Sequence, residues 1–151
     1  IQDTGNVTFA AGNDLDFHGT LTGVPNVQLS GKMLTYRAAG SVNGTGSTTV
    51  TVFGDASVDF YGTINAGGDV VWMVPGLYVR DGSTITASGD VSLSVRGRYD
   101  QRGAITANGA VSIATETYHL YPGHDLTNNA ECEITGAIDS GSTAANGCVE
   151  N

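Results

Sequence analysis

The amino-acid sequence predicts an all-β protein, a single-stranded right-handed parallel β-helix of about seven rungs with three strands in each rung. Two short phrases of sequence recur in step along the chain, at intervals of 20–23 residues. Within each phrase, apolar and polar residues alternate with the two-residue period of a strand that buries one face. A fixed period of this size is typical of a β-solenoid, and the alternation excludes helices as its building blocks.

The first phrase consists of a small or polar residue, a valine, any residue and a large apolar residue. Its copies begin at residues 6, 26, 49, 69, 90, 110 and 131, and residues 90–109 are the clearest template. The last residues of these copies stand at positions 9, 29, 52, 72, 93, 113 and 134, so the steps are 20, 23, 20, 21, 20 and 21 residues. We therefore expect these last residues, including Val52 and Trp72, to stack in the core.

The second phrase is centred on one aliphatic residue that keeps the same period. These residues are Leu21, Val42, Ile64, Ile85, Ile105 and Leu126, with Ala144 as a degenerate seventh. A more variable segment with its own alternation lies between the two phrases, as in residues 15–17 and 77–79, so each rung provides three short strands. The predicted rungs of the single domain 1–151 are 1–25, 26–46, 47–68, 69–89, 90–109, 110–130 and 131–151.

The predicted hand of the coil is right, because crossovers between parallel strands of one sheet are overwhelmingly right-handed. The steps also exceed the roughly eighteen residues that three hexapeptides give a left-handed coil. An antiparallel sandwich is the alternative, since short strands with frequent turn signals also describe that class. A sandwich has no physical reason to repeat one phrase at one period, so the solenoid is preferred.

The composition fits a tightly turned coil and narrows the function. The 151 residues include 22 glycines, and only 14% of the residues are charged. Fifteen carboxylates against six basic residues give a formal net charge of −9, which would repel a nucleic-acid backbone. No apolar run reaches the length of a membrane span, and the start at Ile1 is what a processed mature protein or an excised fragment would have. We therefore expect an extracellular or cell-surface protein without nucleic-acid partners or a membrane span.

The two cysteines are expected to form a disulfide. Cys132 takes the valine position of the seventh copy, and Cys148 follows one turn of the coil later. Neighbouring rungs are about 4.8 Å apart, within the Cα separation that a disulfide requires. The bridge would close a loop of about 17 residues, from 132 to 148 inclusive, and it suits an oxidising compartment. Two buried thiols are the alternative.

No arrangement of residues points to catalysis or to a bound cofactor, so we expect no enzymatic activity. No serine lies in a Gly-x-Ser-x-Gly elbow. Asp14, Asp16 and Asp59 are expected to point outward and form a weak Ca²⁺ candidate, but a solvated acidic stripe is the preferred interpretation. His119 and His124 lack an evident third metal ligand, so we interpret them as ordinary loop histidines.

A ladder of small hydroxyl and amide side chains is the candidate ligand-facing surface. In the third strand of each rung, the residues beside the aliphatic one are expected to point outward and stack in two columns. The ladder comprises Thr20, Thr22, Ser41, Asn43, Thr63, Asn65, Thr84, Thr86, Thr106 and Thr127. Regular Thr-x-Thr ranks resemble the ice-binding faces of antifreeze β-solenoids, although such ladders also simply suit a sheet exposed to water. Asn6 and Asn43 begin glycosylation sequons.

Two adjacent stretches carry a resemblance to a known family. They are STITASGDVSL at residues 83–93 and AITANGAVSI at residues 104–113. Their rhythm is similar to the repeats of filamentous haemagglutinin-like adhesins, the large secreted β-helical proteins of two-partner secretion, and it extends loosely over residues 4–134. The resemblance implies an extracellular, cell-surface or matrix role in a bacterium, and it carries over no catalytic residues.

A structural role is the leading hypothesis for the function. The first and last rungs of a solenoid present unpaired backbone groups, and soluble solenoids normally cover them with caps. We therefore expect a secreted subunit of an extracellular filament, matrix or adhesive surface layer that assembles head to tail with itself. In that arrangement Val7 and Phe9 would lie against Cys132 and Ile134 of the next subunit. The alternative is a monomeric module that binds carbohydrate or ice through the ladder.

Overall fold

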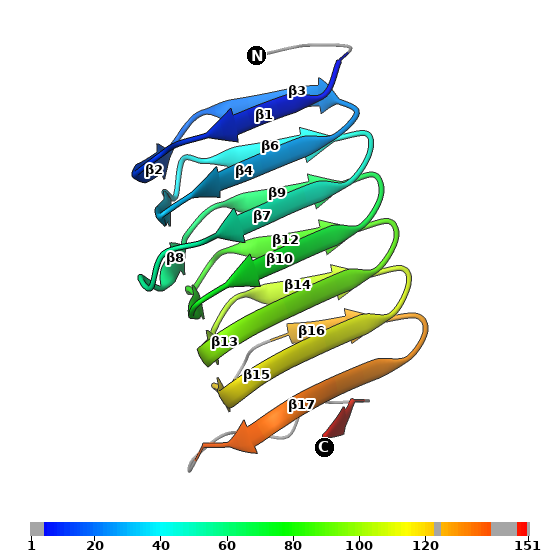
Figure 1. Ribbon diagram of the computed structural model, residues 1–151. Helices are drawn as coiled ribbons and strands as arrows, with labels where there is room; N and C mark the ends of the chain where they lie inside the picture. The colour runs from blue at the N-terminus through cyan, green and yellow to red at the C-terminus, as the bar shows by residue number, and fades with distance from the viewer. Residues whose placement is uncertain (1–4, 123–124, 140–147, 151) are drawn as a thin grey trace.

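The computed structural model describes residues 5–122, 125–139 and 148–150, and these residues form strands and turns without any helix. The strands wind into a rod of stacked rungs (Figure 1). In Figure 1 the chain runs leftward along the front of the rod, returns rightward along the back and descends by one rung at each turn, which makes the coil right-handed. The predicted all-β, right-handed parallel solenoid is therefore confirmed.

The strands of six rungs lie within the described residues, and part of a seventh follows. The first three rungs consist of β1 (Val7–Ala10), β2 (Asp14–Phe17) and β3 (Thr20–Val24), then β4 (Val27–Gly31), β5 (Met33–Tyr36) and β6 (Ser41–Gly44), then β7 (Thr48–Val52), β8 (Val58–Phe60) and β9 (Thr63–Ala66). The next three consist of β10 (Val70–Val74), β11 (Leu77–Val79) and β12 (Thr84–Ala87), then β13 (Val91–Gln101) and β14 (Ala104–Ala107), then β15 (Val111–Leu120) and β16 (Asp125–Asn128). The partial rung contains β17 (Cys132–Ile138) and β18 (Val149–Glu150), and the aliphatic position predicted at residue 144 lies outside the described residues.

Equivalent strands of successive rungs pair in parallel, so the rod has three faces. The first face consists of β1, β4, β7, β10, the N-terminal parts of β13, β15 and β17, and finally β18. The second face consists of β2, β5, β8, β11 and the C-terminal parts of β13, β15 and β17. The third face consists of β3, β6, β9, β12, β14 and β16.

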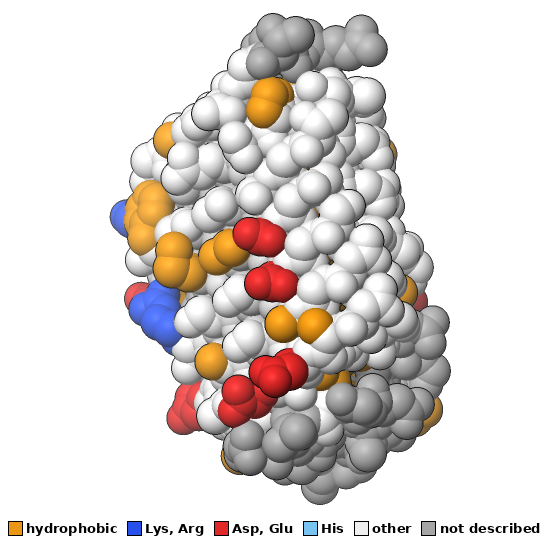
Figure 2. Space-filling model, turned by 90° about the vertical axis from the view of Figure 1, so that its right-hand side faces the viewer, with side chains coloured by type: hydrophobic (Ala, Val, Ile, Leu, Met, Phe, Trp, Pro, Cys, Tyr) orange, Lys and Arg blue, Asp and Glu red, His pale blue; other side chains and the backbone are white. Residues whose placement is uncertain are grey.

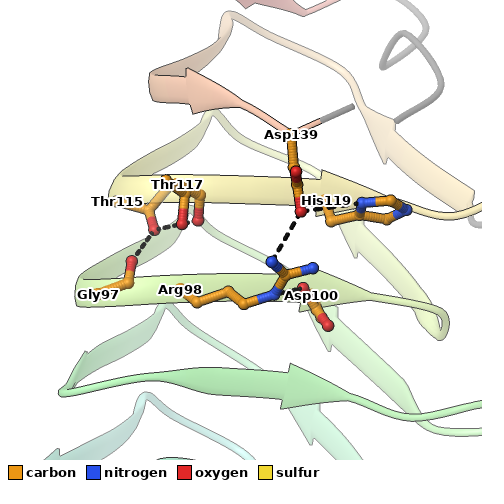
Figure 3. Close-up of polar contacts among 7 residues, drawn as sticks. All are labelled: Gly97, Arg98, Asp100, Thr115, Thr117, His119 and Asp139. Carbon is orange, nitrogen blue, oxygen red and sulfur yellow. Dashed lines mark hydrogen bonds and ion pairs between the residues drawn. The ribbon is translucent and has the colours of Figure 1, made fainter. Parts of the chain in front are cut away.

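In rungs five and six, one strand covers both the first and the second face. β13 and β15 pass from one face to the other through a bulge, where the register between them shifts after Val95. Thr115 stabilises this bend, because its Oγ1 donates to the carbonyl oxygens of Gly97 at 2.6 Å and of Thr117 at 3.0 Å (Figure 3). The predicted three strand segments per rung persist here, but two of them are joined without a loop.

The third copy of the first phrase is shifted by two residues from its predicted register. Val50 pairs with Leu29 on one side and with Trp72 on the other, so the predicted alignment of Val52 with these residues is wrong. The stacked positions are 9, 29, 50, 72, 93, 113 and 134, which gives steps of 20, 21, 22, 21, 20 and 21 residues. The sequence there alternates threonine and valine, and a two-residue period determines the buried face but not the register along the strand. Thr48 consequently takes an inward position that valine holds in most other rungs.

The core is a continuous column of side chains from all three faces. The sequence predicted that the valine and the last residue of the first phrase, and the aliphatic residue of the second phrase, would be buried there. Five of them are each no more than 1% exposed: Val91, Leu93, Ile105, Val111 and Ile113. Trp72 is fully buried as well, so its predicted place in the core is confirmed.

Aromatic rings fill the N-terminal half of this core. Consecutive ring centroids are 4.7–6.3 Å apart along the series Phe9, Phe17, Tyr36, Phe60 and Trp72. The Tyr36 hydroxyl donates a hydrogen bond to the backbone carbonyl oxygen of Thr63 at 2.9 Å. Burial raises the pKa of Tyr36 well above its ordinary value, so this phenol remains a neutral donor.

The corners between the third and the first face are held by side chains that reach the next rung. Asp69 Oδ1 accepts a hydrogen bond from the backbone N–H of Asp90 at 2.9 Å. A Cβ atom on Gly89 would lie only 2.0 Å from the same oxygen. A side chain before Asp90 would have to displace this carboxylate of the preceding rung, so glycine is favoured there.

At the following corners, glycine again occurs where the preceding rung provides a side-chain acceptor, and it is absent where that acceptor is absent. Asp90 Oδ1 accepts from the backbone N–H of Ala110 at 2.8 Å, and a Cβ on Gly109 would lie 2.0 Å from that oxygen. Ala110 itself offers no side-chain acceptor to the rung after it. At that next corner the chain carries Ala130 in the place of glycine.

We predict that replacing Thr48 by valine stabilises the protein. The Thr48 side chain is fully buried, and its Oγ1 has no hydrogen-bond partner among the described residues. An unsatisfied buried hydroxyl costs about 1–3 kcal/mol, so urea titrations followed by circular dichroism should show a rise of about 1 kcal/mol in the free energy of unfolding. Thr49→Val, on the outward side of the same strand, is the matched control and should change it by less than about 0.5 kcal/mol. A loss of stability in T48V would contradict the assigned register.

We also predict a non-additive pair at the corner of rungs four and five. Gly89→Ala should destabilise the protein by about 1–3 kcal/mol, because the new methyl group collides with the Asp69 carboxylate. Asp69→Ala removes the obstacle along with its hydrogen bond. The double variant should therefore be more stable than the sum of the two single effects by about 1 kcal/mol or more in the same titrations. Strict additivity would show that the carboxylate is not what excludes a side chain at position 89.

Candidate functional site

The predicted hydroxyl and amide ladder lies on the third face in the expected register. Successive pairings place Thr22 beside Asn43, Asn43 beside Asn65, and Asn65 beside Thr86. The ten ladder residues are all exposed or half-buried: Thr20, Thr22, Ser41, Asn43, Thr63, Asn65, Thr84, Thr86, Thr106 and Thr127. The structure therefore brings these side chains together on one face of the rod.

Some polar groups of the ladder already form hydrogen bonds with one another. The Asn43 side-chain amide donates to Ser41 Oγ at 2.9 Å, and the Asn65 amide donates to Asn43 Oδ1 at 2.7 Å. Further along the rod, threonine occupies three consecutive rungs of one column, at Thr86, Thr106 and Thr127. This C-terminal part is the most regular stretch of hydroxyl and methyl groups on the face.

The structure does not bring the three candidate calcium ligands together. Thr35 lies between Asp16 and Asp59 in the stacking of the second face, and Asp14 pairs with Met33. Among the described residues, no group of three or more His, Cys, Asp or Glu residues is arranged to hold a metal ion. The expected acidic stripe is therefore interrupted on this face.

Asp16 and Asp59 each have an arginine partner about one rung further along the chain. Arg37 lies 2.9 Å from Asp16, and Arg80 forms an ion pair with Asp59. The hydrogen bond from Arg37 lowers the pKa of Asp16 below its ordinary value. Both members of the Arg37 pair are half-exposed, so its contribution to folding is small.

A second polar cluster joins rungs five, six and seven on the second face (Figure 3). Arg98 donates to Asp100 at 2.6 Å and to Asp139 at 2.7 Å. His119 Nδ1 lies 3.4 Å from the same Asp139 carboxylate. His119 belongs to strand β15, so the prediction that it is a loop histidine is wrong. The sequence analysis missed the cluster because Asp139 is 41 residues from Arg98 and belongs to no repeated phrase. His124 lies outside the described residues.

The N-terminal end of the rod has an apolar hollow of about 460 Å³. Its apolar lining consists of Phe9, Leu15, Phe17 and Leu21. Phe9 and Leu15 are only partly buried, whereas their equivalents in the next rung, Leu29 and Leu34, are at most 1% exposed. Within the described residues, β1, β2 and β3 each pair with another strand on one side only.

The C-terminal end is closed on the first face by a disulfide and a short strand. The predicted bridge between Cys132 and Cys148 is present, with Cα atoms 4.5 Å apart. It holds β18 against β17, where Glu133 pairs with Val149 and Ile134 pairs with Glu150. The edge beside Cys132 and Ile134 is thus occupied by the chain itself, so the expected direct contact of Val7 and Phe9 with this edge does not fit the structure.

The fold defines the protein as a parallel β-solenoid. Comparisons of the chain with protein-family models, with curated proteins and with solved structures gave no match. The resemblance to filamentous haemagglutinin-like adhesins stays a prediction. Within the described part of the chain there is no helix that could cross a membrane.

We predict that removal of the disulfide loosens the last rung and leaves the middle of the rod intact. Under the loop-entropy model, a disulfide that closes a loop of this length stabilises the folded protein by about 3 kcal/mol. In the variant Cys132→Ala with Cys148→Ala, amide hydrogen exchange should accelerate strongly in β17, while β10 keeps its protection, because each rung depends mainly on its neighbours. Thr135→Ala, an exposed substitution on β17, is the control for a change that leaves the bridge intact. Unchanged exchange in β17 would show that the bridge contributes nothing to the end of the rod.

Proposed function

We propose that this protein is a secreted structural subunit of an extracellular filament, matrix or adhesive surface layer that assembles end to end. The observation that supports the proposal best is the apolar hollow that the described residues leave open at the N-terminal end of the rod. The proposal assigns no enzymatic activity and needs no cofactor.

The first rung offers both backbone pairing and apolar contact to a neighbouring subunit. The outer edges of β1, β2 and β3 present N–H and C=O groups of parallel strands, and such edges readily add further strands. Burying the partly exposed Phe9 and Leu15 beneath another rung would add hydrophobic stabilisation. One contact therefore continues both the sheets and the core of the rod.

The opposite end supplies the complementary surface. Among the described residues, β18, the C-terminal part of β17, and β16 are the last strands of the first, second and third faces. In a head-to-tail joint, β1 of one subunit would follow β18 of the next on the first face. A contact between two different ends is heterologous, so it does not close and it generates fibres.

Charge on the sides of the rod favours growth at the ends. Figure 2 shows acidic side chains following one another along one side of the rod, while basic side chains gather at its edge. Asp69, Asp90 and Glu131 are exposed at the corners that this view faces. With a formal net charge of −9, parallel rods repel one another at low salt, whereas the hollow at the N-terminal end offers apolar contact through Phe9, Leu15, Phe17 and Leu21.

The proposed extracellular location is supported by two observations. The disulfide between Cys132 and Cys148 suits an oxidising compartment. The rhythm of the repeats is similar to that of secreted adhesins, as described above. Both are consistent with a subunit that assembles outside the cell.

A monomeric binding module is the second candidate. The regular column of Thr86, Thr106 and Thr127 favours it, because evenly spaced hydroxyl and methyl groups on a flat face suit an ordered surface such as ice. Thermal hysteresis of the purified protein, lost in Thr106→Leu, would support this candidate over assembly. Absence of hysteresis in the wild-type protein would remove the ice-binding version.

We predict that charge in the N-terminal hollow abolishes assembly. The variant Phe9→Asp with Leu15→Asp places two carboxylates where a neighbouring rung would cover them, and burying an unpaired charge is strongly unfavourable. Negative-stain microscopy and light scattering should show filaments for the wild-type protein and monomers for the variant. Phe53→Asp, which adds a charge at a 56% exposed side position, is the control and should leave filaments intact. Circular dichroism checks that the solenoid persists. Wild-type protein that stays monomeric at high concentration, or filaments of unchanged number in the variant, would refute end stacking.

A further inference from the structure

A row of arginine and tyrosine side chains runs along the corner between the second and the third face. The residues are equivalent by position, because the backbone N–H of each bonds to the rung before it: Arg37 to Phe17, Tyr61 to Tyr36, Arg80 to Phe60, Arg102 to Val79 and Tyr121 to Gln101. We call this row, made of Arg37, Tyr61, Arg80, Arg102 and Tyr121, the arginine–tyrosine ridge. It holds three of the protein's six basic residues.

Stacking contacts fix the rings and guanidinium groups of the ridge. The Arg80 guanidinium carbon lies 4.8 Å from the ring centre of Tyr78 and 5.8 Å from that of Tyr61. The Arg102 guanidinium carbon lies 3.9 Å from the ring centre of Tyr121. Tyr61 remains 43% exposed, so its ring is held in place and still accessible. Side chains that are ordered before binding lose less entropy when a ligand arrives.

Ion pairs leave the ridge with little net charge. Arg37 and Arg80 are paired with Asp16 and Asp59, as described above. Among the described residues, Arg102 has no ion-pair partner. The ridge therefore offers flat aromatic faces, fixed N–H donors and carboxylate acceptors on a nearly neutral strip of an otherwise acidic protein.

We propose that the ridge binds a linear, uncharged β-linked polysaccharide. The apolar C–H face of a pyranose ring stacks on an aromatic ring, and its hydroxyl groups accept from guanidinium groups and donate to carboxylates. The ridge has one residue in each of rungs two to six, at the rung spacing of about 4.8 Å, so successive residues can contact an extended polymer lying along the rod. The net charge of −9 repels acidic polymers, which is why an uncharged one is favoured.

This binding surface is independent of the proposed assembly at the ends. The ridge lies on the side of the rod, and none of its five residues lines the N-terminal hollow; of the paired carboxylates, only Asp16, the partner of Arg37, does so. Monomers and filaments would both expose it. It is also distinct from the threonine ladder, whose residues belong to the strands of the third face.

The test is a depletion assay of the full chain with particles of cellulose, chitin and β-1,3-glucan. We expect the wild-type protein to bind at least one of these polymers, with an affinity that is unchanged at about 1 M NaCl, where charge interactions are screened within about 3 Å. Tyr61→Ala and Tyr121→Ala should each weaken binding by about threefold to tenfold, the range expected for the loss of one aromatic contact. Circular dichroism verifies that each variant is folded.

Two matched controls distinguish the ridge from other surfaces. Phe53→Ala removes an aromatic ring that is more exposed than Tyr61 but lies elsewhere, and it should leave binding unchanged. Thr106→Leu alters the threonine ladder and should also leave it unchanged. The proposal is overturned if the wild-type protein binds none of the three polymers, if binding disappears at high salt, or if the ridge variants bind as tightly as the controls.

Discussion

Each rung of this protein depends on its neighbours for its backbone hydrogen bonds, and this dependence constrains the whole structure. Strands pair only with equivalent strands of adjacent rungs, so every position must suit a column of similar residues. Inward columns are apolar because the core is continuous, and residues as different in size as Trp72 and Val50 stand beside each other in one column. The same dependence leaves the two ends as the places where the ladder stops.

The repeat made the fold predictable from sequence. Where the alternation within a strand was too regular, the register of that strand could not be predicted. The aliphatic column through Ile64, Ile85 and Ile105 was correct because a single apolar residue between polar ones has one possible register. The error at Val52 arose because threonine and valine alternate there, and either valine can fill the inward position. Thr48 is buried as a result, and no residue pattern indicated that a hydroxyl would replace valine.

The polar sites were harder to predict, because their partners lie in different rungs. The disulfide was found from the spacing of Cys132 and Cys148 alone, since one turn of coil separates them. The pairing of Asp59 with Arg80 requires knowledge of which residues sit at equivalent corners, and the sequence suggested instead that this carboxylate belongs to a solvated acidic stripe, with a Ca²⁺ site as the weaker candidate. The joining of two faces in β13 also escaped prediction, because the one glycine at the bulge, Gly97, does not distinguish a bend within one strand from a turn between two strands.

The coupling of glycine and aspartate at consecutive corners limits the order in which the repeat can change during evolution. Where Asp69 occupies the space above Gly89, a mutation of the glycine alone creates a collision, whereas loss of the aspartate alone costs one hydrogen bond. Loss of the aspartate first is therefore the less costly order. The pair Ala110 and Ala130 has the composition that this order produces, with both the acceptor and the glycine gone. Divergence of a solenoid from its ancestral repeat thus has a preferred direction, set by the space that one carboxylate fills.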